Sequence, residues 1–296
     1  MVYRAQGMTV VSFQRRADGR ALPANRAGSG LYFLIEPFER AWHHRELIRA
    51  VVSRELKSRF RDSLLGWVWA IFAPLVLLAG YTVVFSVAAP DAAGGASTFD
   101  YAASIFCGLV LFNVFSELLS RAPTLLHEHA NFVKKSIFPS ETIAWTSTIR
   151  AFVYGGISFG TLLVVLVVSG NGLPWTLWLT PLVVLPFFLL MLGTVWILMA
   201  LGAFTKDVSH LVVAVSPVLM FVTPIFFRID QIPEAYRPFI RLNLIGNYVE
   251  MLRDLALKRA FPDPLVAVPT ILASFVVFLV GYRFFQRYKA VIVDVI

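Results

Sequence analysis

Six long apolar stretches constrain the fold of this chain more than any other feature. A helix needs roughly 20 mostly apolar residues to cross the hydrocarbon core of a bilayer. Of the 296 residues 58% are hydrophobic and only 15% are charged, whereas a soluble domain carries about 25% charged residues. The composition therefore excludes a soluble enzyme and a disordered chain, and it predicts an all-α integral membrane protein with six transmembrane helices. The predicted spans are residues 64–89, 102–120, 145–169, 174–203, 209–227 and 265–285.

The distribution of basic residues predicts the orientation of these spans. With six spans both termini lie on the same side of the membrane, and that side would hold 20 of the 26 Lys and Arg residues. Because basic residues are enriched in cytoplasmic loops, we expect both termini in the cytoplasm. The net charge of +8 is then a consequence of topology, with anionic lipid head groups rather than nucleic acid as its partner.

The cytoplasmic segments before the first span differ in character. Residues 1–36 are expected to form a flexible tail because their first part is rich in Arg, Gly and Ala without helical periodicity. Residues 37–63 place apolar side chains such as Trp42 and Val52 near helical spacing, with charged residues largely between them. This pattern predicts an amphipathic helix on the inner membrane surface. An ordinary cytosolic helix that packs on a partner protein is the alternative.

Two segments between spans also carry helical patterns. The cytoplasmic loop 121–144 predicts a short helix over 125–135 that docks a partner. The outer segment 228–264 predicts two short re-entrant helices between spans five and six, which form either a lid or a simple connector. If they form a lid, their apolar stripe is expected to pack against spans five and six, with Glu250, Arg253 and Asp254 facing water or a partner subunit.

The chain lacks the motifs of the common catalytic sites. It contains no G-x-x-x-x-G-K-[ST] nucleotide loop, no G-x-S-x-G and no H-E-x-x-H. His127 and His129 are two residues apart, so they do not share a helix face as paired zinc ligands would, and we predict neither a catalytic nor a metal site. Glu117 is expected to be the only ionisable side chain within a span. The pair Gly156 and Gly160 predicts a close approach of another helix to the third span.

Three motifs resemble the ABC-2 type permeases that export polysaccharides. The first is the run from Arg54 to Ala70 followed by Pro74, which is similar to the entrance of the first span in that family. The second is the run from Lys134 to Glu141. The third combines Ser216-Pro217, Thr223-Pro224-Ile225-Phe226-Phe227, Ile232-Pro233-Glu234, Asn243-Leu244 and Glu250-x-x-Arg253-Asp254. Their order and spacing fit over roughly residues 40–290, although Asn243-Leu244-Ile245 stands where similar proteins often read Asn-Pro-Leu.

The resemblance implies a transport function and its partners. It implies that residues 64–290 form an ABC-2 type transmembrane domain, which pairs with a second copy of the chain and with two copies of a separate P-loop ATPase. That ATPase would bind ATP and Mg, while this chain would bind no cofactor and catalyse no reaction. The implied substrates are lipid-linked glycans such as O antigen, capsule or teichoic acid, and the implied location is the bacterial cytoplasmic (inner) membrane.

Three sets of residues are the candidate functional sites. The candidate substrate entrance is basic, because a lipid-linked glycan carries phosphate at the inner head-group level, and it comprises Arg54, Lys57, Arg59 and Arg61. The candidate ATPase-coupling residues are His127, Glu128, Phe132 and Lys134. The candidate outer gate is the apolar stripe Leu244, Tyr248, Leu252 and Leu255. A permease for drugs or smaller glycolipids, an ion-coupled carrier and a membrane-bound glycan-modifying enzyme remain as alternatives.

Overall fold

The described part of the chain is built from helices. The computed structural model describes residues 32–59, 63, 65–88, 98–130, 139–170, 172–227, 229 and 232–295, and every regular element in them is helical. Four helices are long and apolar enough to cross a membrane, and two shorter apolar helices accompany them. The prediction of an all-α membrane protein is therefore confirmed at this level. The four long stretches are Thr98–Glu128, Glu141–Val168, Trp175–Phe204 and Pro264–Ile292, and the shorter ones are Val68–Val84 and Asp207–Val222.

The first of two compact units ends at His44 and contains α1 (Tyr32–His43). The helix begins at Tyr32 rather than at residue 37, so the end of the expected tail is helical. Pro37 lies inside α1 and removes one backbone hydrogen bond without ending the helix. Phe38 and Trp42 have exposed side chains on α1, with Trp42 71% exposed. The single helix predicted over 37–63 is interrupted at His44.

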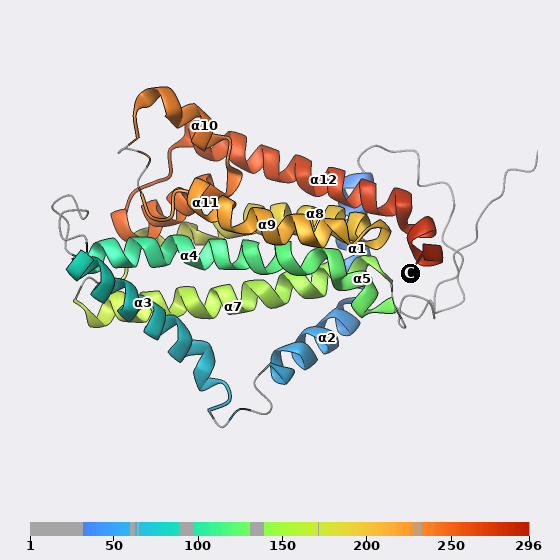
Figure 1. Cartoon of the computed structure of the whole chain (residues 1–296), viewed down its shortest axis with the longest axis horizontal. Coiled ribbons are helices and arrows are strands. Elements are labelled where there is room, and N and C mark those ends of the chain that lie inside the picture. Colours follow the sequence, from blue (N-terminus) through green and yellow to red (C-terminus); the bar gives the residue numbers. More distant parts are fainter. Residues whose placement is uncertain are drawn as a thin grey trace, which may run out of the picture. The chain divides into compact units, whose positions relative to one another are not determined.

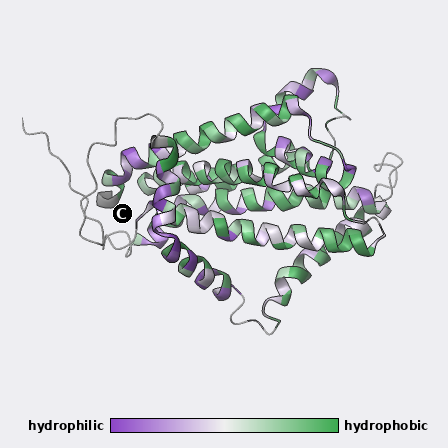
Figure 2. Cartoon of the chain, turned by 180° about the vertical axis from the view of Figure 1, so that it is seen from behind, coloured by the Kyte–Doolittle hydropathy of each residue, from purple (hydrophilic) through white to green (hydrophobic). Residues whose placement is uncertain are grey.

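The second unit, Arg45–Ile296, is a helical bundle. It contains α2 (Arg45–Ser58), α3 (Val68–Ala88), α4 (Thr98–Arg121), the 3-10 turn η2 (Ala122–Thr124), α5 (Leu125–Glu128), α7 (Glu141–Val168), η3 (Trp175–Leu179), α8 (Thr180–Phe204), α9 (Asp207–Val222), η5 (Glu234–Tyr236), α10 (Arg237–Arg241), α11 (Leu244–Arg253), the π-helical turn η6 (Asp254–Lys258) and α12 (Pro264–Val295). Figure 1 shows α4 and α7 side by side, while α3 diverges from them toward its N-terminal end. Figure 2 shows α2 as mostly hydrophilic and the long helices as mostly hydrophobic.

The closest helix pair is formed by α8 and α12, and glycine makes it possible. A Cβ atom on Gly193 would lie 2.6 Å from the Cα of Phe278, and one on Gly281 would lie 2.7 Å from the carbonyl carbon of Gly193. Because both distances are to backbone atoms, the two helices could not keep this spacing with any larger residue. The side chain of Trp196 on α8 packs against Phe278 and Tyr282 of α12, with ring centroids 5.6 Å and 5.1 Å apart.

Within the described part of this chain, no helix makes the expected close approach at Gly156 and Gly160. A Cβ on either residue would meet nothing within 4 Å. The glycine of α7 that does meet a neighbour is Gly155, where a Cβ would lie 2.5 Å from a methyl group of Val114 on α4. The close contact of α7 with α4 is therefore made by a single glycine on another face of the helix.

Prolines explain where two helices differ from their predicted ranges. The fifth apolar helix, α9, ends at Val222 rather than at residue 227, because Thr223 precedes Pro224 and adopts an extended conformation (φ −77°, ψ 133°). Pro181 lies in the first turn of α8, where its missing N–H has no helical partner in any case, so it begins the helix rather than bending it. Pro186 does lie inside α8.

Candidate functional site

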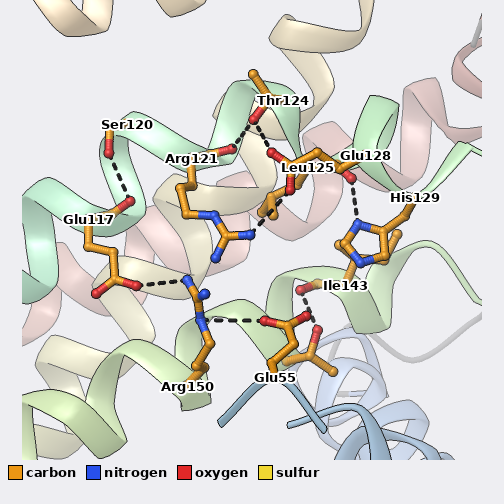
Figure 3. A network of polar contacts seen from close by, with 11 residues as sticks. Glu55, Glu117, Ser120, Arg121, Thr124, Leu125, Glu128, His129, Ile143 and Arg150 are labelled. Carbon is orange, nitrogen blue, oxygen red and sulfur yellow. Dashed lines mark hydrogen bonds and ion pairs between the residues drawn. The ribbon is translucent and has the colours of Figure 1, made fainter. Parts of the chain in front are cut away.

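Arg150 joins the amphipathic helix α2 to two long helices. Its Nη2 lies 2.7 Å from Oε1 of Glu117 on α4, and its Nε lies 3.4 Å from Oε2 of Glu55 on α2. The side chain of Arg150 is only 11% exposed, so water screens these ion pairs weakly. Ile48 and Val52 of α2 are buried, and α2 packs on α7. Apolar packing and one shared arginine therefore hold α2 against the bundle (Figure 3).

Sequence reasoning missed this role of Arg150. Glu117 was expected to be the only ionisable residue within a span, yet Arg150 lies inside the predicted range 145–169 and forms an ion pair with it. The signal was present, because an arginine and a glutamate in neighbouring apolar helices each need a partner of opposite charge. Only the placement of α4 against α7 shows that each is the other's partner.

The candidate coupling segment continues directly from α4. Glu128 accepts hydrogen bonds from Thr124 Oγ1 at 2.7 Å and from Arg121 Nη2 at 3.2 Å, as Figure 3 shows. His127 Nε2 donates to the carbonyl of Gly202 on α8 at 3.3 Å. A Cβ on Gly202 would lie 2.5 Å from the Cα of Pro123, so η2 and α8 meet backbone to backbone. The segment is thus anchored to both α4 and α8.

The coupling prediction can be located only in part. The side chains of His127 and Glu128 are exposed at the end of α5, whereas Phe132 and Lys134 lie outside the described residues. The short helix expected over 125–135 is described as far as residue 130, and it follows α4 through a 3-10 turn that contains Pro123 rather than after a loop.

The entrance candidates lie in two different hollows. Arg54 and Lys57 are exposed on α2 and line a hollow of about 530 Å³. Arg59 follows the end of α2, where its guanidinium lies 4.3 Å from the ring centroid of Tyr154 on α7. Arg59 also lines a cavity of about 460 Å³ between α3, α4 and α7. Arg61 lies outside the described residues.

The outer gate candidates are largely core residues. Tyr248, Leu252 and Leu255 are at most 2% exposed, and only Leu244 is partly exposed. The ring of Tyr248 packs against Phe187 of α8 at 5.2 Å between centroids. The helix α11 packs on α4, α8 and α12, so the stripe contacts the predicted fourth and sixth spans. At the predicted fifth span, α11 meets the turn that follows α9.

Polar contacts tie α11 to α12. Tyr248 donates to Ser274 Oγ at 2.7 Å, because the hydroxyl of Ser274 already donates to the carbonyl of Thr270. Burial raises the pKa of Tyr248 to about 12, so its hydroxyl keeps the proton that it donates. Asn247 Nδ2 donates to Thr270 Oγ1 at 3.0 Å. These contacts hold α11 firmly within the bundle.

Arg253 organises the end of the bundle at which α11 lies, contrary to the expectation that it faces water or a partner. It is 2% exposed. Its guanidinium donates to the carbonyls of Ser104 (3.0 Å), Pro224 (2.6 Å) and Ile225, and to Glu250 Oε1 (2.7 Å). The turn after α9 leaves carbonyls without helical partners, and the planar guanidinium can reach several of them at once. The sequence showed these residues only as separate motif fragments.

Asn243 completes the cluster around Arg253. Its side-chain oxygen accepts from the backbone N–H groups of Ile245 (3.1 Å) and Gly246 (3.3 Å), so it caps the N-terminus of α11. Its Nδ2 donates to Thr223 Oγ1 at 2.9 Å. A Cβ on Gly246 would lie 2.6 Å from Cδ of Pro224. The cap by Asn243 therefore defines the start of α11, although no proline follows Asn243 in this chain.

A charge reversal tests the docking of α2. Arg150→Glu places three carboxylates together, and we expect it to release α2 at a cost between the roughly 1 kcal/mol of an exposed ion pair and the roughly 3–5 kcal/mol of a buried one. The readout is thiol labelling of Val52→Cys in a Cys107→Ala background, which should accelerate. The swap Arg150→Glu with Glu55→Arg should slow labelling again, and equal protection in all variants would contradict the role of Arg150.

The described residues form two polar clusters, one at each end of the bundle. No group of three or more His, Cys, Asp or Glu side chains among them could hold a metal ion. What the structure brings together at one end is an amphipathic helix, an arginine-centred ion-pair network and a segment anchored at the ends of two long helices. At the other end, a buried arginine binds a turn between helices.

Comparison with known proteins gives this arrangement a context. The family model described as ABC-2 type transporter matches residues 46–257. The O-antigen export system permease protein RfbA of Myxococcus xanthus is 23% identical over 242 residues, which cover 80% of this chain and 91% of the relative. A protein of the same name from Klebsiella pneumoniae is 22% identical over 250 residues, 82% of this chain and 92% of the relative.

A third relative is named for polysialic acid transport. The polysialic acid transport protein KpsM of Escherichia coli is 23% identical over 215 residues, which cover 70% of this chain and 80% of that protein. The alignments therefore cover most of both partners rather than a shared fragment.

Proposed function

This chain belongs to the ABC-2 type transporter family, and from that premise we propose that it is the permease subunit of an exporter that moves a lipid-linked polysaccharide across the bacterial cytoplasmic membrane. The observation that carries the proposal is the similarity, over 82% and 70% of the chain, to relatives named for O-antigen export and polysialic acid transport. The sequence has no nucleotide-binding loop of its own, so a separate ATPase subunit would bind ATP and Mg and drive transport.

We propose that the chain crosses the membrane six times, with α3 and α9 as the two shorter spans. The 21 residues of α3 reach about 31 Å, enough to cross, whereas the 16 of α9 reach only about 24 Å. The turn that follows α9 would complete this fifth span. Irregular backbone at such depth requires internal hydrogen-bond partners, and Arg253 supplies them to Pro224 and Ile225. Thiol labelling of Lys289→Cys only from inside and of Ala93→Cys only from outside tests this topology.

The cytoplasmic end would serve coupling and substrate entry. The segment η2–α5 contacts α8 through Gly202 and α4 through Arg121. A conformational change of the ATPase in contact with His127 and Glu128 would therefore be transmitted to two spans at once. The exposed apolar face of α1 around Phe38 and Trp42 suits the membrane interface, and the basic residues of α2 suit an anionic head group. Exposed apolar residues along α3 and α9 would be covered by lipid and by a second copy of the chain.

Gene deletion tests this function. Without the chain, surface polysaccharide should fall at least about tenfold while the lipid-linked polymer accumulates inside the cell, and expression of the wild-type chain should restore export. The tagged chain should purify with a P-loop ATPase, two copies of each. Unchanged surface polysaccharide in the deletion strain, together with a change in drug sensitivity, would instead favour a permease for drugs or smaller glycolipids.

A further inference from the structure

The cavity of about 460 Å³ between α3, α4 and α7 has an apolar wall formed by α3, whereas α4 and α7 contribute both polar and apolar side chains. Its polar side chains come from two long helices and from the end of α2: Arg59, Asn113, Glu117, Tyr154 and Ser158. Its apolar walls include Trp69 and Leu77 of α3 and Val110 of α4. A space with both kinds of lining suits an amphiphile better than a purely hydrocarbon or a purely aqueous ligand.

Asn113 is the most informative residue in this cavity. It is exposed, although the residues on either side of it, Phe112 and Val114, are only 4% exposed. Within the described part of the chain its amide has no hydrogen-bond partner. An amide in the middle of an apolar, membrane-length helix is costly unless it faces a polar group. Asn113 therefore offers a hydrogen-bonding partner to a polar group in the cavity at this depth.

The charges lie at one end of the cavity. Glu117 is one helical turn from Asn113 toward the C-terminus of α4, and it is paired with Arg150. Arg59 lies against the ring of Tyr154 at the same end, so the mouth of the cavity carries a guanidinium group. Ser158 is one helical turn from Tyr154 toward the C-terminus of α7. The cavity thus runs from a cation at its mouth to neutral hydrogen-bonding groups further inside.

An apolar groove continues from the cavity along α3. A hollow of about 650 Å³ shares Trp69, Ala73 and Leu77 with the cavity and extends as far as Val84. From residue 69 to residue 84 a helix rises about 22 Å, which is most of the roughly 30 Å thickness of the hydrocarbon core of a bilayer. The groove is lined by apolar and small residues except for Tyr81.

We propose that this cavity holds the phosphorylated sugar head of a lipid, with the phosphate at Arg59, the sugar hydroxyl groups at Asn113 and Ser158, and the hydrocarbon chain in the groove of α3. Trp69 offers an apolar ring face to the C–H side of the sugar. The inference rests on the proposed function, because it names the part of the lipid-linked substrate that the entrance recognises. It places recognition inside one copy of the chain.

Binding to the purified full chain in phosphatidylcholine nanodiscs tests the proposal. The probes are a polyprenyl diphosphate carrying one N-acetylglucosamine, the same polyprenyl diphosphate without the sugar, and phosphatidylglycerol, with retention measured by native mass spectrometry. Wild type should retain the sugar-bearing lipid about tenfold more than either of the others, and Asn113→Leu should remove that preference, as expected for the loss of a hydrogen bond. Arg59→Gln should weaken retention of both polyprenyl lipids.

A matched pair of alanines controls for folding and for groove shape. Ala73 and Ala79 are both exposed on α3, but only Ala73 lines the cavity and the groove. Ala73→Phe should lower retention of the sugar-bearing lipid about tenfold, and Ala79→Phe should leave it unchanged. The proposal is overturned if wild type shows no preference for the sugar, if phosphatidylglycerol is retained equally, or if Asn113→Leu behaves as wild type.

The two proposals fail in distinguishable ways. If deletion of the gene abolishes surface polysaccharide but the purified chain shows no preference for the sugar-bearing lipid, the cavity is not the recognition site and the exporter function stands. If the preference and its dependence on Asn113 are found while surface polysaccharide persists in the deletion strain, the site stands and the exporter function is wrong.

Discussion

Arg253→Leu is expected to lower the free energy of unfolding by about 3–5 kcal/mol, because it removes one partner of a buried ion pair and leaves the others without donors. The lost donors serve three backbone carbonyls and the carboxylate of Glu250. For a chain of this size such a loss lowers Tm by roughly 6–20 °C. Thermal unfolding of the purified chain in detergent measures it. Arg253→Lys should recover only part of the loss, because one ammonium cannot reach all of these acceptors.

The control for Arg253 is an arginine of the same outer segment. Arg241 is exposed on α10, so Arg241→Leu should change Tm little. The same cluster also dictates how the gate is tested: because Tyr248 and Leu252 are core residues, truncating both to alanine would cost several kcal/mol in packing alone. Tyr248→Phe, which removes only the hydroxyl, is the better probe. If the Arg253→Leu and Arg241→Leu variants unfold at the same temperature, the buried cluster around Arg253 does not stabilise this end of the bundle.

Gly281→Val is expected to separate α8 from α12. Even the first added carbon would lie 2.7 Å from the carbonyl carbon of Gly193, and backbone atoms cannot move aside as a side chain can. The helices must therefore part, which loosens the packing of Trp196 on Tyr282 and Phe278. We expect a cost at or above the upper end of the roughly 1–3 kcal/mol typical of overpacking. Tm and the yield of monodisperse protein measure it.

Two other helical glycines separate packing from helix propensity. Gly80 on α3 and Gly156 on α7 both face open space, where a Cβ would meet nothing within 4 Å. Gly80→Val and Gly156→Val introduce the same β-branched side chain into a helix without a backbone neighbour. If either lowers Tm as much as Gly281→Val does, the intimate contact between α8 and α12 is not the cause of the loss.

Local signals predicted the elements of this chain well. Runs of apolar residues identified the long helices. A bilayer does not tolerate unpaired backbone N–H and C=O groups, so few structures other than helices can cross it. Apolar stripes and the positions of prolines predicted the approximate ranges of α2 and α11. The ends were less predictable, because Pro224 ends α9 through the conformation of Thr223, whereas Pro181 begins α8. A proline interrupts or initiates a helix depending on where the helix starts, and periodicity alone does not specify that start.

Partner assignments were the part that local signals could not supply. Glu117 and Arg150 are 33 positions apart, and Arg253 binds carbonyls of Ser104 and Pro224, 149 and 29 positions away. Such pairs depend on which faces of two helices meet. The same holds for glycine: Gly156 and Gly160 have the spacing of a helix contact yet face open space, whereas Gly193 and Gly281 form one across 88 positions of sequence.

Composition, charge bias and apolar periodicity by themselves determined that this is an all-α membrane protein, because these properties depend only on transfer of side chains between water and lipid. The resemblance of its motifs pointed to the family. The tertiary structure alone decided that Arg253 is buried, that Arg150 holds α2 in place, and that Asn113 faces a cavity beside Arg59. Each of these depends on the rotation and spacing of packed helices, and those are set by all the contacts of the bundle together rather than by any one segment.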